Sequence, residues 1–178
     1  GHQLEFKVQG GTSMLRVDPD GVKFSGDTAA ANALSDYEEG SFDPKVFQGG
    51  SEVGDAAYNS GFTGGQYTKI GRMVFMTCSL RLTSKGTVTA TNTFQIGGLP
   101  FVPIANVRAR TAVSIFDHVG AGIDTTGNQT GSLQGLITNS GVISFRLNDY
   151  TGTSAETIQF ADIGNSLYIQ LSFFFETS

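Results

Sequence analysis

Four carboxylates stand close together after residue 33 and form the densest group of potentially reactive side chains in the sequence. They are Asp36, Glu38, Glu39 and Asp43. Two of them could serve as general acid and base in glycoside hydrolysis, which needs carboxyl groups roughly 5–10 Å apart across a cleft. Their oxygens could instead bind Ca²⁺. The third interpretation, which we favour, is a solvated turn whose carboxylates cap backbone amides or pair with Lys and Arg.

Other catalytic signatures are missing from the sequence. His118 is the one internal histidine, Cys78 is the one cysteine, and no Gly-x-Ser-x-Gly element occurs, so no Ser-His-Asp or Cys-His arrangement is indicated. The glycines at 120 and 122 lack the third glycine of a dinucleotide-binding turn. Cys78 lies in an apolar strand pattern, which predicts a buried thiol and not a nucleophile. We therefore expect a non-enzymatic protein without cofactor or metal.

Aromatic side chains beside polar groups are better candidates, because sugar binding needs exposed rings next to hydrogen-bonding groups. Three such residues lie in or beside the glycine-rich stretch 49–65, namely Tyr58, Phe62 and Tyr67. A fourth, Tyr150, follows Asn148 and Asp149. Each ring alone is more typical of ordinary packing, but together they are the best ligand-site candidates in the sequence.

Composition excludes several classes of partner. The 178 residues carry a net charge of −5 with scattered Lys and Arg, whereas nucleic-acid binding needs a basic stripe. No apolar run approaches the roughly 20 residues of a membrane-spanning helix, so no membrane insertion is expected. The 24 glycines fall between apolar runs and indicate tight turns between short strands.

Residues 3–26 predict three short strands. Apolar and polar residues alternate around Phe6 and Val17, and the sequence Asp-Pro-Asp-Gly at 18–21 predicts a tight turn. Three such strands bury too little apolar surface to be stable alone. The simplest partner surface is the same segment of another copy of the chain. A short helix at 27–33, capped by Asp27, is expected to connect this stem to the rest.

Strand patterns with a period of two fill the remainder. We expect strands at 72–82, 87–96, 107–116, 132–138, 142–147 and 167–175. In the first of these, one face comprises Val74, Met76, Cys78, Leu80 and Leu82. Stretches 117–131 and 148–155 are predicted to be long polar loops, and 49–65 a loop or weak edge strand. Tyr168 and Phe174 make the second face of the last strand partly apolar, which a subunit contact would cover. The pattern predicts an all-β, jelly-roll-like antiparallel β-sandwich.

Three motifs, in order, resemble one protein family. The text at 34–44 (Leu-x-Asp-Tyr-Glu-Glu-Gly-x-Phe-x-Pro) resembles the LDDYEEGTW/FTP signature that opens C-terminal head domains of bacteriophage tail fibre and tailspike proteins. Tyr-x-Lys-Ile-Gly at 67–71 and Ile-x-Gly-Leu-Pro-Phe at 96–101 resemble the next two landmarks of that family. The resemblance covers 34–178, and Ser35 replaces the usual acidic residue.

This resemblance implies a homotrimeric fibre tip, exposed on a virion, that binds a host surface glycan or protein. A β-stem and connector would occupy 1–33 and the sandwich head 34–178. We expect ligand contacts in the two polar loops, from Asp117, His118, Asn128, Asn148, Asp149 and Tyr150. Two alternatives are a purely structural virion module, such as a head fibre or trimerisation cap, and a fragment of a polysaccharide depolymerase that uses Asp36, Glu38 or Glu39.

Overall fold

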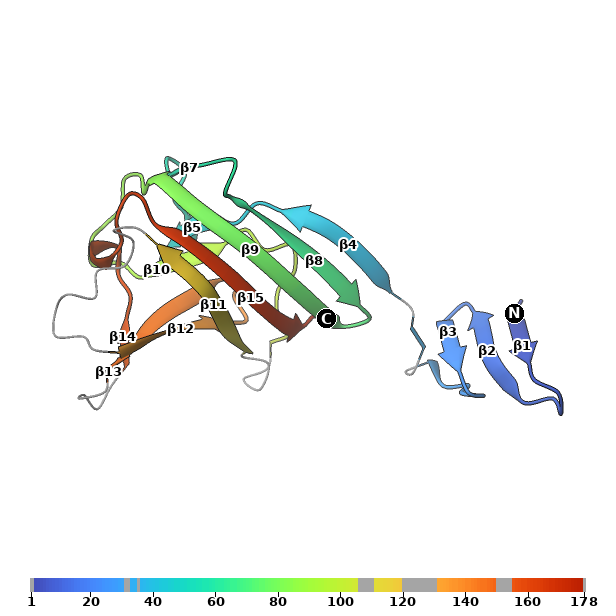
Figure 1. Ribbon diagram of the computed structural model, residues 1–178. Helices are drawn as coiled ribbons and strands as arrows, with labels where there is room; N and C mark the ends of the chain where they lie inside the picture. Colours follow the sequence, from blue (N-terminus) through green and yellow to red (C-terminus); the bar gives the residue numbers. More distant parts are fainter. Residues whose placement is uncertain are drawn as a thin grey trace.

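Two separate β-sheet assemblies make up the protein. The computed structural model describes residues 2–30, 33–34, 36–105, 111–119, 131–149 and 155–177, and at 117–119, 131–132, 148–149 and 155 the backbone alone. A three-stranded sheet at the N-terminal end stands apart from a larger group of strands, and a narrow connector joins them (Figure 1). All strand pairs within the described residues are antiparallel, which confirms the predicted all-β class.

The stem sheet consists of β1 (Leu4–Lys7), β2 (Ser13–Asp18) and β3 (Gly21–Phe24), in that order. The turn before β3 is closed by the carboxylate of Asp18, which accepts a hydrogen bond from the backbone N–H of Asp20 at 3.0 Å. Gly21 follows at a φ of 129°, a conformation that favours glycine. The three strands predicted for residues 3–26 are therefore confirmed.

The connector contains turns and no α-helix within its described residues. Asp27 accepts a hydrogen bond from the backbone N–H of Ala29 at 2.9 Å, as expected for a capping residue. Residues 27–29 have no helical hydrogen bonding, so the predicted helix is wrong there. Leu34 instead forms an antiparallel bridge with Val22, which ties the connector back to the edge of the stem sheet.

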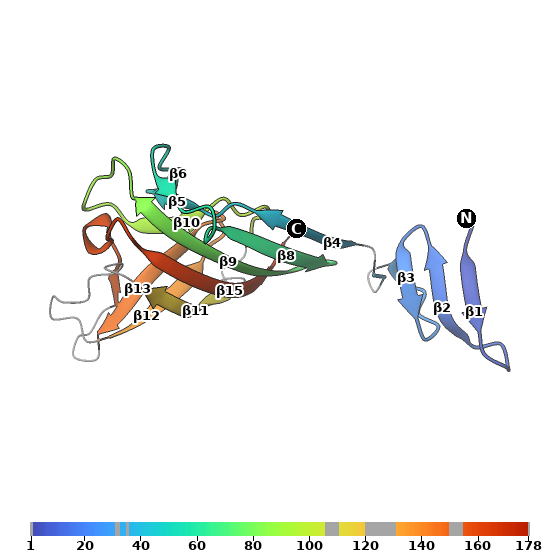
Figure 2. The ribbon, with the colours of Figure 1, turned by 45° about the horizontal axis from the view of Figure 1, so that its top comes forward.

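Two layers form the head (Figure 1; turned by 45° in Figure 2). The front sheet has the order β4 (Tyr37–Phe42), β8 (Gly64–Ile70), β9 (Met73–Ser84), β15 (Tyr168–Glu176) and β11 (Thr111–Val119). The back sheet continues with β12 (Gly131–Ile137), β13 (Ile143–Asp149), β10 (Phe94–Gly97), β5 (Lys45–Gln48) and β6 (Ser51–Glu52). Strand β7 (Ala57–Tyr58) pairs with β9, and β14 (Ala155–Thr157) pairs with β13. A 3₁₀ turn, η3, spans Phe160–Asp162.

Strand β11 belongs to both sheets. Its first residues, 111–113, pair with β12, and its residues from Ser114 onward pair with β15, with an irregularity at Phe116 within that second part. Such a bulge bends a strand and strengthens its twist. The chain therefore turns the corner from the front sheet to the back sheet along this one strand.

One hydrophobic core lies between the two layers. The predicted inner face of β9 is confirmed, because Val74, Met76, Cys78, Leu80 and Leu82 are all buried. Alternate residues of β15 face the same core from the neighbouring strand. At the centre, the ring of Phe94 lies 5.5 Å from the ring centroids of both Phe145 and Phe160. Burial of these alternating positions gives the head a hydrophobic core of its own.

The strand predicted at 87–96 is wrong over 87–92, and β10 begins only at Phe94. Side chains from other parts of the chain form hydrogen bonds with this segment instead. The Asp55 carboxylate accepts hydrogen bonds from the backbone N–H and the hydroxyl of Thr87, at 2.9 and 2.6 Å. The Gln48 amide oxygen accepts one from the backbone N–H of Thr89 at 2.6 Å. A backbone held in this way has no neighbouring strand to join, whatever the β propensity of its threonines.

Both predicted polar loops begin too early. Asp117 and His118 continue β11 opposite Gln170 and Ile169, and Asn148 and Asp149 continue β13. At their far ends Gly131 already belongs to β12 and Ala155 to β14. These strands are longer than predicted because hydrogen bonding to the neighbouring strands continues along them, and a polar local sequence does not reveal such pairing.

Among the residues that the structure describes, no helix has the length and apolar character needed to cross a membrane.

Candidate functional site: the outer face of the front sheet

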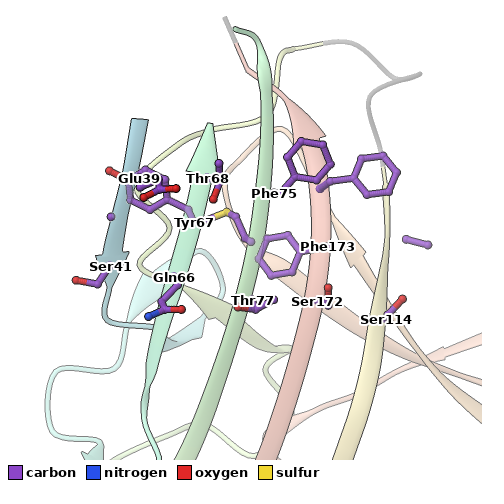
Figure 3. A pocket seen from close by; sticks show the side chains of 14 residues that line it. Glu39, Ser41, Gln66, Tyr67, Thr68, Phe75, Thr77, Ser114, Ser172 and Phe173 are labelled. Atoms are coloured by element: carbon purple, nitrogen blue, oxygen red, sulfur yellow. The ribbon is translucent and has the colours of Figure 1, made fainter. Parts of the chain in front are cut away.

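A row of five uncharged polar residues crosses the outer face of the front sheet, one from each strand. We call it the polar row: Ser41, Gln66, Thr77, Ser172 and Ser114. The register pairs each of these residues directly with the next, from β4 through β8, β9 and β15 to β11. Figure 3 shows the five side chains following one another across the strands.

Strand alternation places the polar row on the outside. The neighbours of Thr77 along β9, Met76 and Cys78, are buried in the core, and those of Ser172 along β15, Leu171 and Phe173, are buried as well. Successive side chains of a strand point to opposite faces, so the residue between two core residues faces away from the core. All five members of the row are exposed. Within the described part of the chain, none of their side chains has a hydrogen-bond partner.

Aromatic side chains flank the polar row on both sides. Towards the stem, Phe75 and Phe174 are 48% and 50% exposed, and their ring centroids are 6.2 Å apart. On the other side, Phe62 packs edge-on against Tyr168 at 5.9 Å. Phe116, at the bulge of β11, is 85% exposed. These rings form two apolar borders with the hydrogen-bonding groups of the row between them.

Two open grooves meet at the polar row. The first, of about 850 Å³, runs between the row and the Phe75–Phe174 pair. The second, of about 670 Å³, lies on the side of Phe62 and Phe116. Ser41, Gln66, Thr77 and Ser172 line both grooves. Glu39 is the one charged residue among the residues that line the two.

Three of the four carboxylates after residue 33 are engaged in local contacts. Asp36 forms an ion pair with Lys69, and Glu38 accepts a hydrogen bond from the hydroxyl of Tyr67 at 2.5 Å. Glu39 accepts one from the hydroxyl of Tyr37, which raises the pKa of that phenol. Only the Asp36–Lys69 pair is of the predicted kind, because Glu38 and Glu39 contact tyrosine hydroxyls and lie on strand β4, not in a turn.

Three further observations concern the chemistry that the described residues can perform. Glu38 and Glu39 are adjacent on β4 and therefore face opposite sides of the sheet, so they do not share a cleft. No group of three or more His, Cys, Asp or Glu side chains with the arrangement of a metal site occurs among the described residues. Cys78 is buried as predicted, and its burial raises the pKa of the thiol to about 12.

Two of the three aromatic sugar-binding candidates in this part of the chain pack against the core. The hydroxyl of Tyr58 accepts a hydrogen bond from the backbone N–H of Val46 at 2.9 Å, and Tyr67 packs edge-on against Phe101 at 5.0 Å. Phe62 differs, because it is 47% exposed and borders the second groove. The guanidinium carbon of Arg81 lies 4.9 Å from the centroid of its ring.

The described ligand residues predicted from the polar loops lie near strand ends, although Asp117 pairs with Gln170, which lines the second groove. Asp117 and His118 are near the end of β11, and Asn148 and Asp149 are at the end of β13, paired with the start of β12. The antiparallel register brings both ends to the same edge of the head, far from the stem (Figure 1). Asn128 and Tyr150 lie outside the described residues. The polar row itself was missed, because its members come from five separate strands and no local motif marks them.

The comparisons with known proteins give no further guide. No model of a protein family, no curated protein and no solved structure matches this chain. Its function is therefore argued from its own residues.

Proposed function

We propose that the protein is the non-enzymatic, receptor-binding tip of a homotrimeric virion fibre, which attaches a bacteriophage to a glycan or protein on the host cell surface. The three ordered motifs at 34–44, 67–71 and 96–101 suggested this function. The observation that carries it is the stem sheet, whose apolar face is left largely exposed by the described residues of its own chain.

The two faces of the stem sheet are sharply different. One face carries only apolar residues from the three paired strands: Leu4, Phe6, Leu15, Val17, Val22 and Phe24. Phe6 is 55% exposed and Phe24 57% exposed. A continuous apolar face of this kind marks an interaction surface in a soluble protein. Because the same surface is present on every copy of the chain, self-association buries it with no other protein needed.

The opposite face of the stem is charged, and its ion pairs close within the chain, although the buried Ser13 Oγ and Arg16 Nε have no hydrogen-bond partner among the described residues. The Lys23 ammonium lies 3.0 Å from the carboxylate of Asp18 and 2.6 Å from that of Asp20, and the lysine side chain is fully covered. Arg16 approaches Asp18 at 2.7 Å. This face suits the outside of an assembly, because its charges have partners without another chain. The apolar face would then turn towards the axis of the trimer.

The head supports attachment in a different way. It closes its own core, so its outer surfaces are free for recognition. The jelly-roll-like arrangement is part of the proposal. It is supported by the long crossings between the sheets, which place β15 beside β9 and β10 beside β5. The resemblance is to jelly rolls only as a general class, because β8 and β9, which are consecutive in the chain, are neighbours in the same sheet.

Adsorption to cells tests the attachment function. The intact protein, fluorescently labelled, is incubated with a panel of bacterial strains, and bound protein is counted after washing. We expect saturable binding to a subset of strains, competed by unlabelled protein. A folded trimer that binds none of a broad panel would contradict receptor binding and favour the purely structural virion module. Shortening of a capsular or O-antigen polysaccharide by the protein would favour the depolymerase.

A further inference from the structure

We propose that the polar row and its aromatic borders bind a neutral oligosaccharide that lies across the strands of the front sheet. This inference rests on the proposed attachment function, since it names the site and the ligand class. It places the ligand on the outer face of the sheet and not in the polar loops at the end of the head.

The first argument is unused hydrogen-bonding capacity. Each Ser or Thr hydroxyl of the row can donate one hydrogen bond and accept two, and the Gln66 amide can do both. None of these groups has a side-chain partner in the described part of the chain. Neighbouring strands lie about 4.8 Å apart, so the row is roughly 19 Å long. A ligand that fits it must present hydroxyl-like groups repeatedly along a line, as an oligosaccharide does.

The second argument comes from the borders of the row. A sugar ring has polar edges and apolar C–H faces, and the C–H groups pack against the negative faces of aromatic rings. Phe75 and Phe174 stand half exposed on one side of the row, and Phe62 and Phe116 stand on the other (Figure 3 shows Phe75). The sheet holds the polar row, Phe75 and Phe174 on a rigid surface, which lowers the ordering cost of binding, and Phe62 lies in the turn before β8.

The third argument concerns charge. Of the residues that line the two grooves, Glu39 alone is charged, and no Lys or Arg is among them. Arg81 lies over the Phe62 ring, with its guanidinium carbon 4.9 Å from the ring centroid, but it lines neither groove. An acidic sugar in the first groove would be repelled by Glu39, since a desolvated charge needs a partner. The site thus favours neutral sugars over uronic or sialic acids.

A second copy of the chain is the competing occupant of this face. An apolar partner surface would cover Phe75 and Phe174 but leave the hydroxyls of Thr77, Ser172 and their neighbours buried without partners, which is costly. The stem differs, because its exposed face carries no polar side chain. The polar row therefore selects a hydroxyl-rich ligand, whereas the stem selects another copy.

The test uses the intact protein on an array of immobilised neutral and acidic bacterial oligosaccharides, two to six sugars long. We expect binding to neutral members, with longer chains bound more tightly. The double variant Thr77→Val/Ser172→Ala removes two hydroxyls and should weaken binding about tenfold. Phe174→Ala should weaken it about fivefold. The matched control Thr157→Val/Ser51→Ala changes the same residue types on exposed strands of the back sheet and should leave binding unchanged.

Three outcomes overturn the site. They are selective binding of acidic sugars, neutral binding that the row variants leave unchanged, and protection of Ser172→Cys from maleimide in the assembled protein, which would show that another copy covers the face. Cys78 is buried, so the wild-type protein controls the labelling. If the protein adsorbs to cells and the row variants adsorb equally well, the site is wrong while the attachment function stands. If neither cells nor sugars are bound, both fail.

Discussion

The stem and the head are both built from antiparallel strands, but they differ in how far their apolar faces are buried. In the head, two sheets face each other, so that Phe94 is completely buried between Phe145 and Phe160. In the stem, a single sheet leaves Phe6 more than half exposed. The head closes a core within a single chain, whereas we propose that other copies of the chain complete the stem.

This difference separates the two tasks of the proposed fibre tip. The stem offers a surface that any copy of itself can cover, and its opposite face has its charges paired. The head offers a surface on which uncharged polar groups remain unpaired between aromatic borders. The first surface is suited to self-association and the second to a hydroxyl-rich ligand, and a variant that affects one should leave the other intact.

Truncation of the head core should have the largest effect on stability. Phe94→Ala removes a fully buried ring from the Phe145–Phe160 cluster and should lower the free energy of unfolding by about 3–5 kcal/mol. Urea denaturation followed by far-UV circular dichroism measures this. Phe62→Ala, on the exposed face, is the comparison and should cost about 1 kcal/mol. Equal losses would mean that the two layers do not share a closed core.

A charge on the apolar face of the stem should break assembly and spare the head. Phe6→Lys places an ammonium where the proposed trimer buries a ring, and should weaken association about a hundredfold or more. Sedimentation velocity over a range of concentrations reports the change. Gln3→Lys adds the same charge next to strand β1, at an exposed residue outside its ladder, and is expected to keep the assembly. Dissociation by both variants alike would show a general charge effect and not a specific face.

Acid should weaken the two regions through different carboxylates. The hydrogen bond from Lys23 holds the pKa of Asp18 below its usual value of 3.8, and that from the Thr87 hydroxyl lowers the pKa of Asp55. A lowered folded-state pKa gives stability that is present above the usual value and is lost as pH falls through the lowered one.

Melting measured from pH 7 down to pH 2 follows this loss in each region. Asp18→Asn should reduce the acid dependence of assembly, and Asp55→Asn that of head unfolding. The prediction fails if Asp18→Asn changes the pH dependence of head unfolding as much as that of assembly, or if Asp55→Asn changes that of assembly as much as that of head unfolding.

The rate at which Cys78 reacts with maleimide should show the smallest change, but it reports on the head alone and so distinguishes the head from the stem. Burial raises the pKa of this thiol to about 12, so it should react slowly with maleimide at pH 7 in the folded protein. Phe6→Lys should leave the rate unchanged, because dissociation of the stem does not open the head. Phe94→Ala should increase it through more frequent unfolding. Faster labelling of Phe6→Lys would show that the head depends on the stem.

Residues with strong local patterns made much of this fold predictable. The alternation from Val74 to Leu82 fixed the inner face of β9, and the Asp-Pro-Asp-Gly turn at 18–21 fixed the β2–β3 hairpin. The stretch 87–92 could not be predicted, because Asp55 and Gln48, distant in sequence, hold its backbone out of the sheet.

The candidate site depended on information that local patterns do not contain. From the sequence, Thr77 is an ordinary outward-facing strand residue. Only the strand register shows that it lies between Gln66 and Ser172. Similarly, the polar composition at Asp117 and His118 suggested a loop, whereas pairing with β15 keeps them in a strand. Strand order across five segments is set by long-range packing, so the row could be found only in three dimensions.

The mass of the intact protein in solution tests the central claim most directly, because the proposed function requires the stem to associate with other copies. Analytical ultracentrifugation from 1 to 100 μM would measure it, a range chosen on the order of affinities typical of specific association. We predict a single species with three times the chain mass of 18.8 kDa. A particle of 18.8 kDa across the whole range would show that the apolar face of the stem is stable in water, and would contradict the account.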